Sequence, residues 1–267
     1  MVNETIFLKL GGSLLTDKTG VEAVRGDVLG RLAHEIAAAR KGNPALTMVL
    51  GHGSGSFGHV AARKYGTRKG VRTAEGWHGF AEVSAAAARL NKLVRESLLE
   101  AGVPAVTLQP SASARCKGGR IEYLALEPVT AALEVGLVPL VYGDVAFDTE
   151  LGGTIISTEE IMSYLAESLR PTWFLLAGET AGVLDTNGQV IPQITRQNFD
   201  DIQGALGGSR GTDVTGGMAA KVIEMLALAE KYPTLSIRIF SGLVDGQLTA
   251  VLPNPAANIG THIFHRE

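Results

Sequence analysis

The chain has 267 residues, of which 45% are hydrophobic and 19% charged, with a net charge of −3 and one cysteine, Cys116. This balance indicates a compact globular protein and excludes a disordered chain, and a single cysteine excludes an intramolecular disulfide and a thiolate metal cage. The charge offers no basic surface for nucleic acid, and no apolar run reaches the ~18 residues of a membrane span. We therefore expect no nucleic-acid or membrane partner and a cytoplasmic protein.

In the first half of the chain, short apolar runs alternate with helical patterns. The first run, residues 5–10, predicts a strand that ends in Gly11-Gly12-Ser13. A second strand is expected over 46–50, followed by a glycine-rich turn over 51–58. The remaining predictions are helices over 27–40, 80–101 and 128–135, and strands over 105–108 and 138–142.

The second half repeats this alternation. Helices are expected over 161–169 and 218–231 and strands over 173–176 and 236–240, with a short helix after Gly242. Strands that alternate with helices predict an α/β fold, with a mainly parallel open sheet and helices on both faces. We expect one domain over 1–267, with two lobes of about 1–155 and 156–267 that meet within 152–171. Ligands on such sheets lie at the carboxyl ends of the strands.

Lys9 is the first candidate for chemistry. A lysine inside an apolar strand is costly to bury unless its ammonium reaches water or an anion. Gly11 and Gly12 follow it and can expose backbone N–H groups, which favours an anion site over a lysine that merely reaches solvent. Lys18, in the polar loop that follows, can fold back over the same space.

The segment 51–59 (GHGSGSFGH) places four glycines after a strand, so its backbone amides can converge on phosphate oxygens. It matches neither the Rossmann spacing nor a P-loop. His59 adds a donor that titrates near neutral pH and can bind a phosphate monoester, although helix capping or packing also suits a histidine there. We expect His52 to be structural.

Two further segments place charged groups near the same edge. Asp144 and Glu159 each follow an apolar run, and carboxylates beside lysines can hold Mg²⁺ through water or orient the lysines. Asp144 is equally suited to capping a turn or helix. Gly216-Gly217 enters a helix whose second turn carries Lys221, which offers a helix N-terminus and a cation to a nucleotide phosphate.

Together these segments resemble the amino acid kinase family, and most closely its isopentenyl phosphate kinase branch. The resemblance runs in family order over nearly the whole chain. The matching segments are LKLGGSLLTDK (8–18), GHGSGSFGH (51–59), QPSA (109–112), VPLVYGDVAFD (138–148) and TDVTGGMAAK (212–221). The histidine that ends the second segment is the most specific element.

The resemblance implies the amino acid kinase fold (an αβα sandwich), with an acceptor-binding N-terminal lobe and an ATP-binding C-terminal lobe. It implies transfer of a phosphoryl group from ATP, with Mg²⁺, to isopentenyl phosphate in a homodimeric enzyme. Lys9 would span the donor and acceptor phosphates, Lys18 would stabilise charge on the transferred group, and His59 would bind the acceptor phosphate. The implied acceptor contacts are Ser54, His59, Gly143, Asp144 and Thr158. The implied nucleotide contacts are Lys9, Gly11, Gly12, Ser13, Gly55, Glu179, Gly217 and Lys221.

Two segments depart from the family pattern. An Ile-Ser-Gly-Asp segment is replaced by residues 156–159 (ISTE), which keeps the charge on a longer side chain. An Asp-Val-Asp-Gly pattern is replaced by residues 179–182 (ETAG), which loses one carboxylate. Glu159 and Glu179 therefore stand where the family has aspartates.

Two alternatives share these motifs. One is a kinase of the same fold that acts on another small phosphate or phosphonate such as fosfomycin. An apolar acceptor pocket, for which the helix over 80–93 is a candidate wall, would favour the isoprenoid, whereas a small polar pocket would favour the phosphonate. The other is a nucleotide-binding regulator without turnover, against which Lys9, Lys18 and Lys221 together argue.

Overall fold

The computed structural model describes residues 5–17, 19–204 and 217–266, and the side chain of His59 is outside that description. The strands are β1 (Thr5–Leu10), β2 (Thr47–His52), β3 (Ala105–Thr107), β4 (Arg115–Lys117), β5 (Arg120–Tyr123), β6 (Val138–Tyr142), β7 (Asp144–Asp148), β8 (Gly152–Ile156), β9 (Trp173–Gly178), β10 (Gln193–Ile194), β11 (Ser236–Ser241) and β12 (Thr261–Phe264). The helices are α1 (Gly12–Leu15), α2 (Gly26–Gly42), α3 (Gly55–Tyr65), α4 (Ala74–Glu100), α5 (Glu127–Glu134), α6 (Thr158–Leu169), α7 (Arg196–Gln203), α8 (Gly217–Lys231) and α9 (Gln247–Val251), with 3₁₀ turns η1 (Thr67–Lys69) and η2 (Pro110–Ala112).

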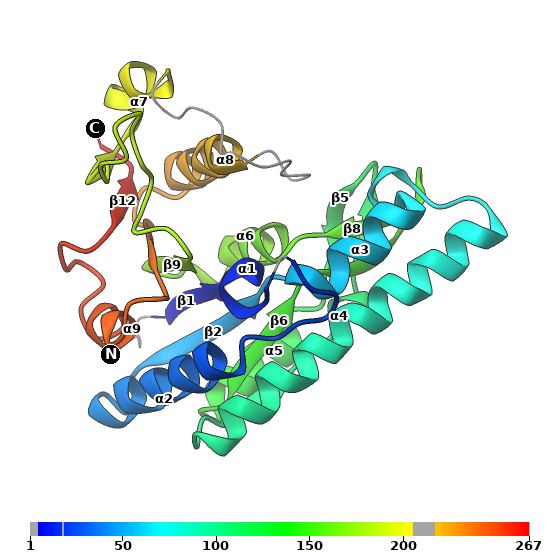
Figure 1. Ribbon diagram of the computed structural model, residues 1–267, viewed down its shortest axis with the longest axis horizontal. Coiled ribbons are helices and arrows are strands. Elements are labelled where there is room, and N and C mark those ends of the chain that lie inside the picture. Colours follow the sequence, from blue (N-terminus) through cyan, green and yellow to red (C-terminus); the bar gives the residue numbers. More distant parts are fainter. Residues whose placement is uncertain (1–4, 18, 205–216, 267) are drawn as a thin grey trace.

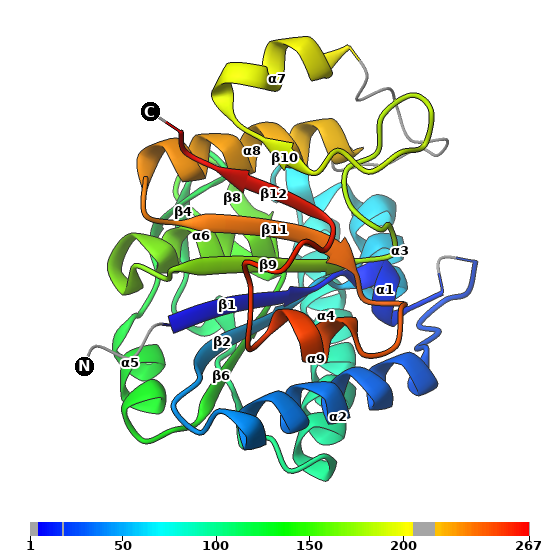
Figure 2. The same cartoon turned by 90° about the vertical axis from the view of Figure 1, so that its left-hand side faces the viewer.

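The large sheet has eight strands in the order β10-β12-β11-β9-β1-β2-β6-β3. β1 lies near its middle and pairs in parallel with β2 on one side and β9 on the other. The β11–β12 pair is antiparallel, and the other neighbours in this sheet run parallel. Figure 2 shows these strands running nearly side by side across the molecule. The predicted mainly parallel α/β sheet is confirmed.

Helices cover both faces of this sheet, and each face has its own hydrophobic core. One core joins the sheet to α2, α4 and α9, and the other joins it to α5, α6 and α8. In Figure 1, α6 and α8 lie above β1 and β2, while α2 and α4 lie below them. Side chains along β1 alternate between the two cores, since Leu8 and Leu10 belong to the first and Phe7 to the second. By the same alternation Lys9 faces α6 and α8.

A second, four-stranded sheet in the order β5-β4-β7-β8 was not predicted. Its strands are three to five residues long, and β4 and β5 carry several exposed charged residues, so their apolar pattern is weak. Phe80 and Val83 of α4 pack with Val145 of β7 and Ile155 of β8, so this sheet lies against α4. Strands from 1–155 and from 156–267 share the large sheet, so the sheet does not divide the chain at the predicted boundary. The division into two lobes stays a prediction.

The glycine-rich turn predicted over 51–58 is shorter than expected. β2 continues to His52, and α3 already begins at Gly55. The prediction was wrong there because glycine weakens the helical signal in sequence even where the chain forms a helix N-terminus.

Cys116 is fully buried, and burial raises the pKa of its thiol to about 11. Within the described ranges, no helix is both long and apolar enough to cross a membrane.

Candidate active site

The predicted phosphate-site segments meet at the carboxyl edge of the large sheet. β1, β2 and β9 are neighbours and run parallel, so the glycines that follow β1 and β2 end at the same edge. Lys9 lies one residue before the end of β1, opposite Gly51 of β2 and Leu176 of β9. The expectation that these segments converge is confirmed for the described residues.

Lys9 and Glu159 form the centre of this edge. Lys9 is 7% exposed, and its ammonium donates a hydrogen bond to Oε1 of Glu159, in the first turn of α6. Nζ of Lys221, on α8, lies 3.6 Å from the same oxygen. One carboxylate therefore gathers two lysines that are separated by more than two hundred positions in the sequence. Glu159 orients lysines, which is one of the two roles that the sequence left open for it.

The charges in this cluster are strongly coupled. Burial alone raises the pKa of a carboxyl group, but the ammonium groups of Lys9 and Lys221 outweigh it and hold the pKa of Glu159 at about 2. Burial lowers the pKa of Lys9, and Lys221 adds to this, while Glu159 opposes both. Burial and the neighbouring carboxylate of Glu159 raise the pKa of nearby Glu224, so this second carboxyl group is less readily ionised. The two ammonium groups gathered at Glu159 favour a phosphate group as the ligand.

The glycines after β1 and β2 approach each other backbone to backbone. A Cβ atom built on Gly12 would lie 2.4 Å from the nitrogen of Gly55, and one built on Gly53 would lie 2.7 Å from the nitrogen of Gly12. Gly55 has a φ of 49°, a left-handed conformation that favours glycine. No side chain fits between these loops, so the N-terminus of α3 is brought next to β1, where a helix favours an anion.

Some predicted contacts have their polar groups engaged within the protein. The N–H of Gly11 donates to the carbonyl of Ala177 at 2.8 Å, so it is not exposed to a phosphate as the sequence suggested. The hydroxyl of Thr158 donates to the carbonyl of His52 at 2.6 Å. Asp144 is 1% exposed and accepts from the N–H groups of Ser111 and Val145. Thr158 and Asp144 thus tie loops of this edge together, and direct substrate contact by either stays a prediction.

Other predicted residues lie around this edge. Ser13 is partly buried in α1, and Gly143 lies between β6 and β7, where a Cβ atom would be 3.4 Å from the carbonyl oxygen of Ile156. Ser54 precedes α3, and its carbonyl accepts from the N–H groups of Phe57 and Gly58. His59 lies in α3, but its side chain, like the whole of Lys18, falls outside the described residues.

On the nucleotide side, Glu179 follows β9 and lies 3.1 Å from Nη1 of Arg25, the residue before α2. Gly217 begins α8 with a φ of 69°, and Lys221 follows one turn later. Arg25 was not predicted, because nothing in the sequence links it to residue 179. Lys221 therefore lies near Lys9 at the carboxylate of Glu159, whereas Glu179 pairs with Arg25.

His52 is structural, as predicted. It is fully buried, with Nδ1 3.1 Å from the carbonyl of Gly53 and Nε2 3.1 Å from Nδ2 of Asn91. Burial, with a smaller contribution from Lys9, lowers the pKa of His52 to about 4, so the ring is neutral at physiological pH. A neutral ring fits these bonds if Nδ1 donates and Nε2 accepts. Its ring stacks on Tyr142, which fixes the end of β2 against β6.

An apolar cluster lies beside α3, on the acceptor side predicted from the sequence. Its buried members are Val71, Phe80, Val83 and Val145, and Ala61, Ala62 and Ile155 pack against them. Ala62 lies in α3 three residues after His59, so the cluster and the glycine loop share one helix. The predicted wall over 80–93 contributes Phe80 and Val83, and aliphatic and aromatic side chains line this region.

The residues at this edge do not fit a magnesium ion held by protein ligands alone. Among the residues that the structure describes, no three or more His, Cys, Asp or Glu side chains converge on one point. The carboxylate of Glu159 is already shared by two lysines, and both carboxylate oxygens of Asp144 accept backbone bonds.

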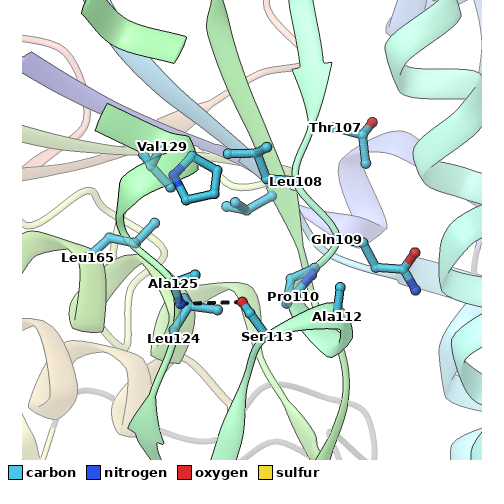
Figure 3. A pocket seen from close by; sticks show the side chains of 12 residues that line it. Thr107, Leu108, Gln109, Pro110, Ala112, Ser113, Leu124, Ala125, Val129 and Leu165 are labelled. Atoms are coloured by element: carbon cyan, nitrogen blue, oxygen red, sulfur yellow. Dashed lines mark hydrogen bonds between the residues drawn. The ribbon is translucent and has the colours of Figure 1, made fainter. Parts of the chain in front are cut away.

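A cavity of about 220 Å³ opens elsewhere, between β6, η2, α5 and α6. Figure 3 shows its largely aliphatic lining, with Leu108, Val129 and Leu165 around it. None of the predicted site residues lines it. The cavity is therefore distinct from the lysine–glutamate centre.

These observations define a phosphate-binding edge on an α/β sheet, and comparison with known proteins identifies the family. The sequence profile of the amino acid kinase family matches residues 4–241. The chain belongs to the amino acid kinase family, as the motifs predicted.

Several of the similar proteins are isopentenyl phosphate kinases. The chain is 36% identical to the isopentenyl phosphate kinase of Methanothermobacter thermautotrophicus, over 92% of this chain and 94% of that protein. It is 39% identical to the isopentenyl phosphate kinase of Haloferax volcanii, over 91% of this chain and 95% of that protein. Its fold matches an X-ray structure of isopentenyl phosphate kinase with a TM-score of 0.81 and 32% identity, over 97% of this chain and 99% of that one.

Proposed function

We propose that this protein transfers the γ-phosphoryl group of ATP to isopentenyl phosphate, giving isopentenyl diphosphate and ADP. The observation that carries the proposal is the apolar cluster around Phe80 and Val83, which shares α3 with the glycine loop at the phosphate edge. A cationic centre beside an apolar wall suits an acceptor with a phosphate head and a hydrocarbon tail. The similarity to isopentenyl phosphate kinases over most of the chain supports the same acceptor.

The transfer needs position and charge neutralisation more than a protein nucleophile. An oxygen of the acceptor phosphate forms a bond to the γ-phosphorus, and the bond from that phosphorus to the bridging oxygen of ADP breaks in line. The electron pair leaves on ADP, so no enzyme intermediate forms. The acceptor oxygen is already anionic near neutral pH, so His59 acts as a binding group and not as a base.

Lys9 is the residue best placed to act on both phosphates. Glu159 fixes its ammonium at the end of β1, so the charge is in place before substrate arrives. Lys221 reaches the same carboxylate from α8 and extends the positive charge toward the nucleotide side. Lys18 would add charge on the transferred group.

Magnesium belongs to the same proposal as a partner of ATP. Mg²⁺ keeps much of its hydration and binds nucleotide phosphates readily, so it needs no dedicated protein cage. We infer that it arrives with ATP, which agrees with the full engagement of Glu159 and Asp144. Chelation of free magnesium should then abolish turnover and leave the melting temperature of the protein without nucleotide unchanged.

The direct test is ADP release with ATP, comparing isopentenyl phosphate, fosfomycin and no acceptor. Turnover on isopentenyl phosphate alone is expected. His59→Ala should abolish it, and Lys9→Met should lower kcat about a hundredfold or more, because a preorganised donor is lost. Turnover on fosfomycin alone would overturn the acceptor. If no acceptor stimulates ADP release, the chain is a nucleotide-binding regulator or acts on another acceptor.

The homodimer and the cytoplasmic location are proposals of the same kind. The family resemblance suggests the homodimer, and sedimentation equilibrium of the purified protein measures it. A monomer across the working concentration range would contradict it. Imaging of the tagged protein in its own cell tests the location.

A further inference from the structure

Arg68 joins three elements next to the lysine–glutamate centre. It lies in η1, shortly after α3, and Nη1 donates to the carbonyl of Ile155 at the end of β8. Its guanidinium also donates two parallel hydrogen bonds to Glu160 of α6, from Nη1 to Oε2 at 2.9 Å and from Nη2 to Oε1 at 2.7 Å. The backbone carbonyl of Arg68 accepts from the hydroxyl of Thr154 at 3.3 Å. These contacts fix η1, β8 and α6 relative to one another.

Glu160 is itself part of the cap that begins α6. Its Oε2 accepts from the N–H of Ser157 at 2.6 Å, and the hydroxyl of Ser157 accepts from the N–H of Glu160 at 3.1 Å. This reciprocal capping box fixes the first helical turn. Glu159, which lies on the same turn directly before Glu160, is the residue that holds Lys9 and Lys221.

We propose that Arg68, through Glu160, is a positioning residue for phosphoryl transfer, which holds the first turn of α6 so that Glu159 keeps Lys9 in place. The inference rests on the proposed function and adds a residue that none of the sequence motifs contains. Arg68 donates to the backbone carbonyl of Ile155, whose side chain packs against the apolar cluster, and binds Glu160 in the first turn of α6, so it links the cluster to that turn.

The geometry of the pair argues for a local role. The side chain of Arg68 is 52% exposed, and exposed ion pairs contribute little to global stability. A forked, two-bond contact, however, restrains direction as well as distance. Its effect should therefore appear in the alignment of Glu159 rather than in the free energy of unfolding. Even a small displacement of a catalytic group strongly lowers the rate of the chemical step.

Loss of this restraint should also change the titration of Lys9. The charged groups that face Lys9 are Glu159 of α6 and Lys221 and Glu224 of α8, with neutral His52 on β2. Glu159 raises the pKa of Lys9 against the lowering effect of burial. If Glu159 moves away, the pKa of Lys9 falls further. The alkaline limb of kcat/KM, which reports the free enzyme, then moves to lower pH.

The test compares Arg68→Gln and Glu160→Gln with the wild type and with Arg115→Gln. Arg115 pairs with Glu122 on the outer hairpin and is similarly exposed, at 60%, so it serves as a matched control. Arg68→Gln should lower kcat about tenfold or more, with KM for both substrates little changed and the alkaline limb shifted to lower pH. Arg68→Lys keeps the charge but not the fork and should recover part of the loss.

A double-mutant cycle completes the test. Arg68→Gln and Glu160→Gln together should cost little more than either alone, because they break one contact. Equal effects of Arg68→Gln and Arg115→Gln on kcat would overturn the inference, as would a higher KM at unchanged kcat. An inactive wild type with a sound fold would instead refute the proposed function, so the two failures are distinguishable.

Discussion

Glu159 is the residue on which the charge balance of the site depends. It is an ionised carboxylate in a mostly buried position, with a side chain 14% exposed, and two lysines compensate for its burial. Removing one member of such a cluster leaves an uncompensated buried charge, which costs more than the pair contributes. Its side chain reaches both Lys9 and Lys221.

The depressed pKa of Glu159 predicts an acid-sensitive contribution to stability. The pKa is about 2 in the folded protein, against 4.5 for an ordinary glutamate. The group therefore stabilises the fold above pH ~4.5, and this contribution is lost as the pH falls toward 2. Urea unfolding of the wild type between pH 6 and pH 3 should show a steeper loss than that of Glu159→Gln. Parallel curves for the two proteins would contradict this assignment.

At the scale of elements, the sequence predicts those with a strong period and misses those without one. β1 and β6 have the predicted bounds, because each is a continuous apolar run buried on both faces. The four-stranded sheet was missed, because β4 and β5 are short and mostly exposed, and because β7 and β8 are only five residues long. The Lys9–Glu159 contact joins residues 150 positions apart, so only the fold reveals which carboxylate serves the lysine. The Arg68–Glu160 contact escaped prediction for the same reason.

For two helical glycines, we predict opposite effects on stability when each is changed to alanine. Gly12 begins α1, and its added Cβ would meet backbone atoms of Gly55 that cannot rotate away. Gly12→Ala should therefore destabilise the protein by about 1–3 kcal/mol and separate the two phosphate loops, which lowers kcat. Gly30 lies inside α2, and its added Cβ would meet nothing within 4 Å. Gly30→Ala should raise stability by about 0.5–1 kcal/mol at unchanged kcat.

Thermal unfolding and steady-state kinetics of both variants check this pair of predictions. If Gly12→Ala has the stability and kcat of the wild type, the two loops are farther apart than the structure has them. A destabilised Gly30→Ala would contradict the open space around α2.

For the molecule as a whole, the proposed acceptor site lies where the small sheet meets the large one. α4 packs against both, so the apolar cluster is enclosed by α3, α4, β7 and β8. Phe80 lies on the inner side of an aromatic group with Trp77 and Phe147. Trp77 and Phe147 are partly exposed, at 37% and 56%, whereas Phe80 is buried. If the acceptor tail enters this cluster as proposed, we predict that Phe80 limits its length.

Phe80→Leu should relax this limit. The smaller side chain leaves room for a longer chain, so kcat/KM for a ten-carbon prenyl phosphate should rise about tenfold relative to that for isopentenyl phosphate. Steady-state assays with both acceptors measure the ratio. Phe147→Leu removes a ring from the exposed side of the same group and should leave the ratio unchanged. A change in Phe147→Leu but not in Phe80→Leu would place the tail on the outer side.

The position of β1 in the middle of the large sheet has a consequence for how the chain folds during its synthesis. β1 is synthesised well before one of its two partners, β9, which is completed only at residue 178, and before β11, beside β9, which is completed at residue 241. Until then the backbone N–H and C=O groups on the edge of β1 that β9 will cover are unpaired on the nascent chain. Such an edge is a site for wrong pairing and aggregation, and contacts this distant in sequence make folding slow. The strand that carries Lys9 is therefore enclosed on both sides only after β9, about 170 positions later in the chain, has been made.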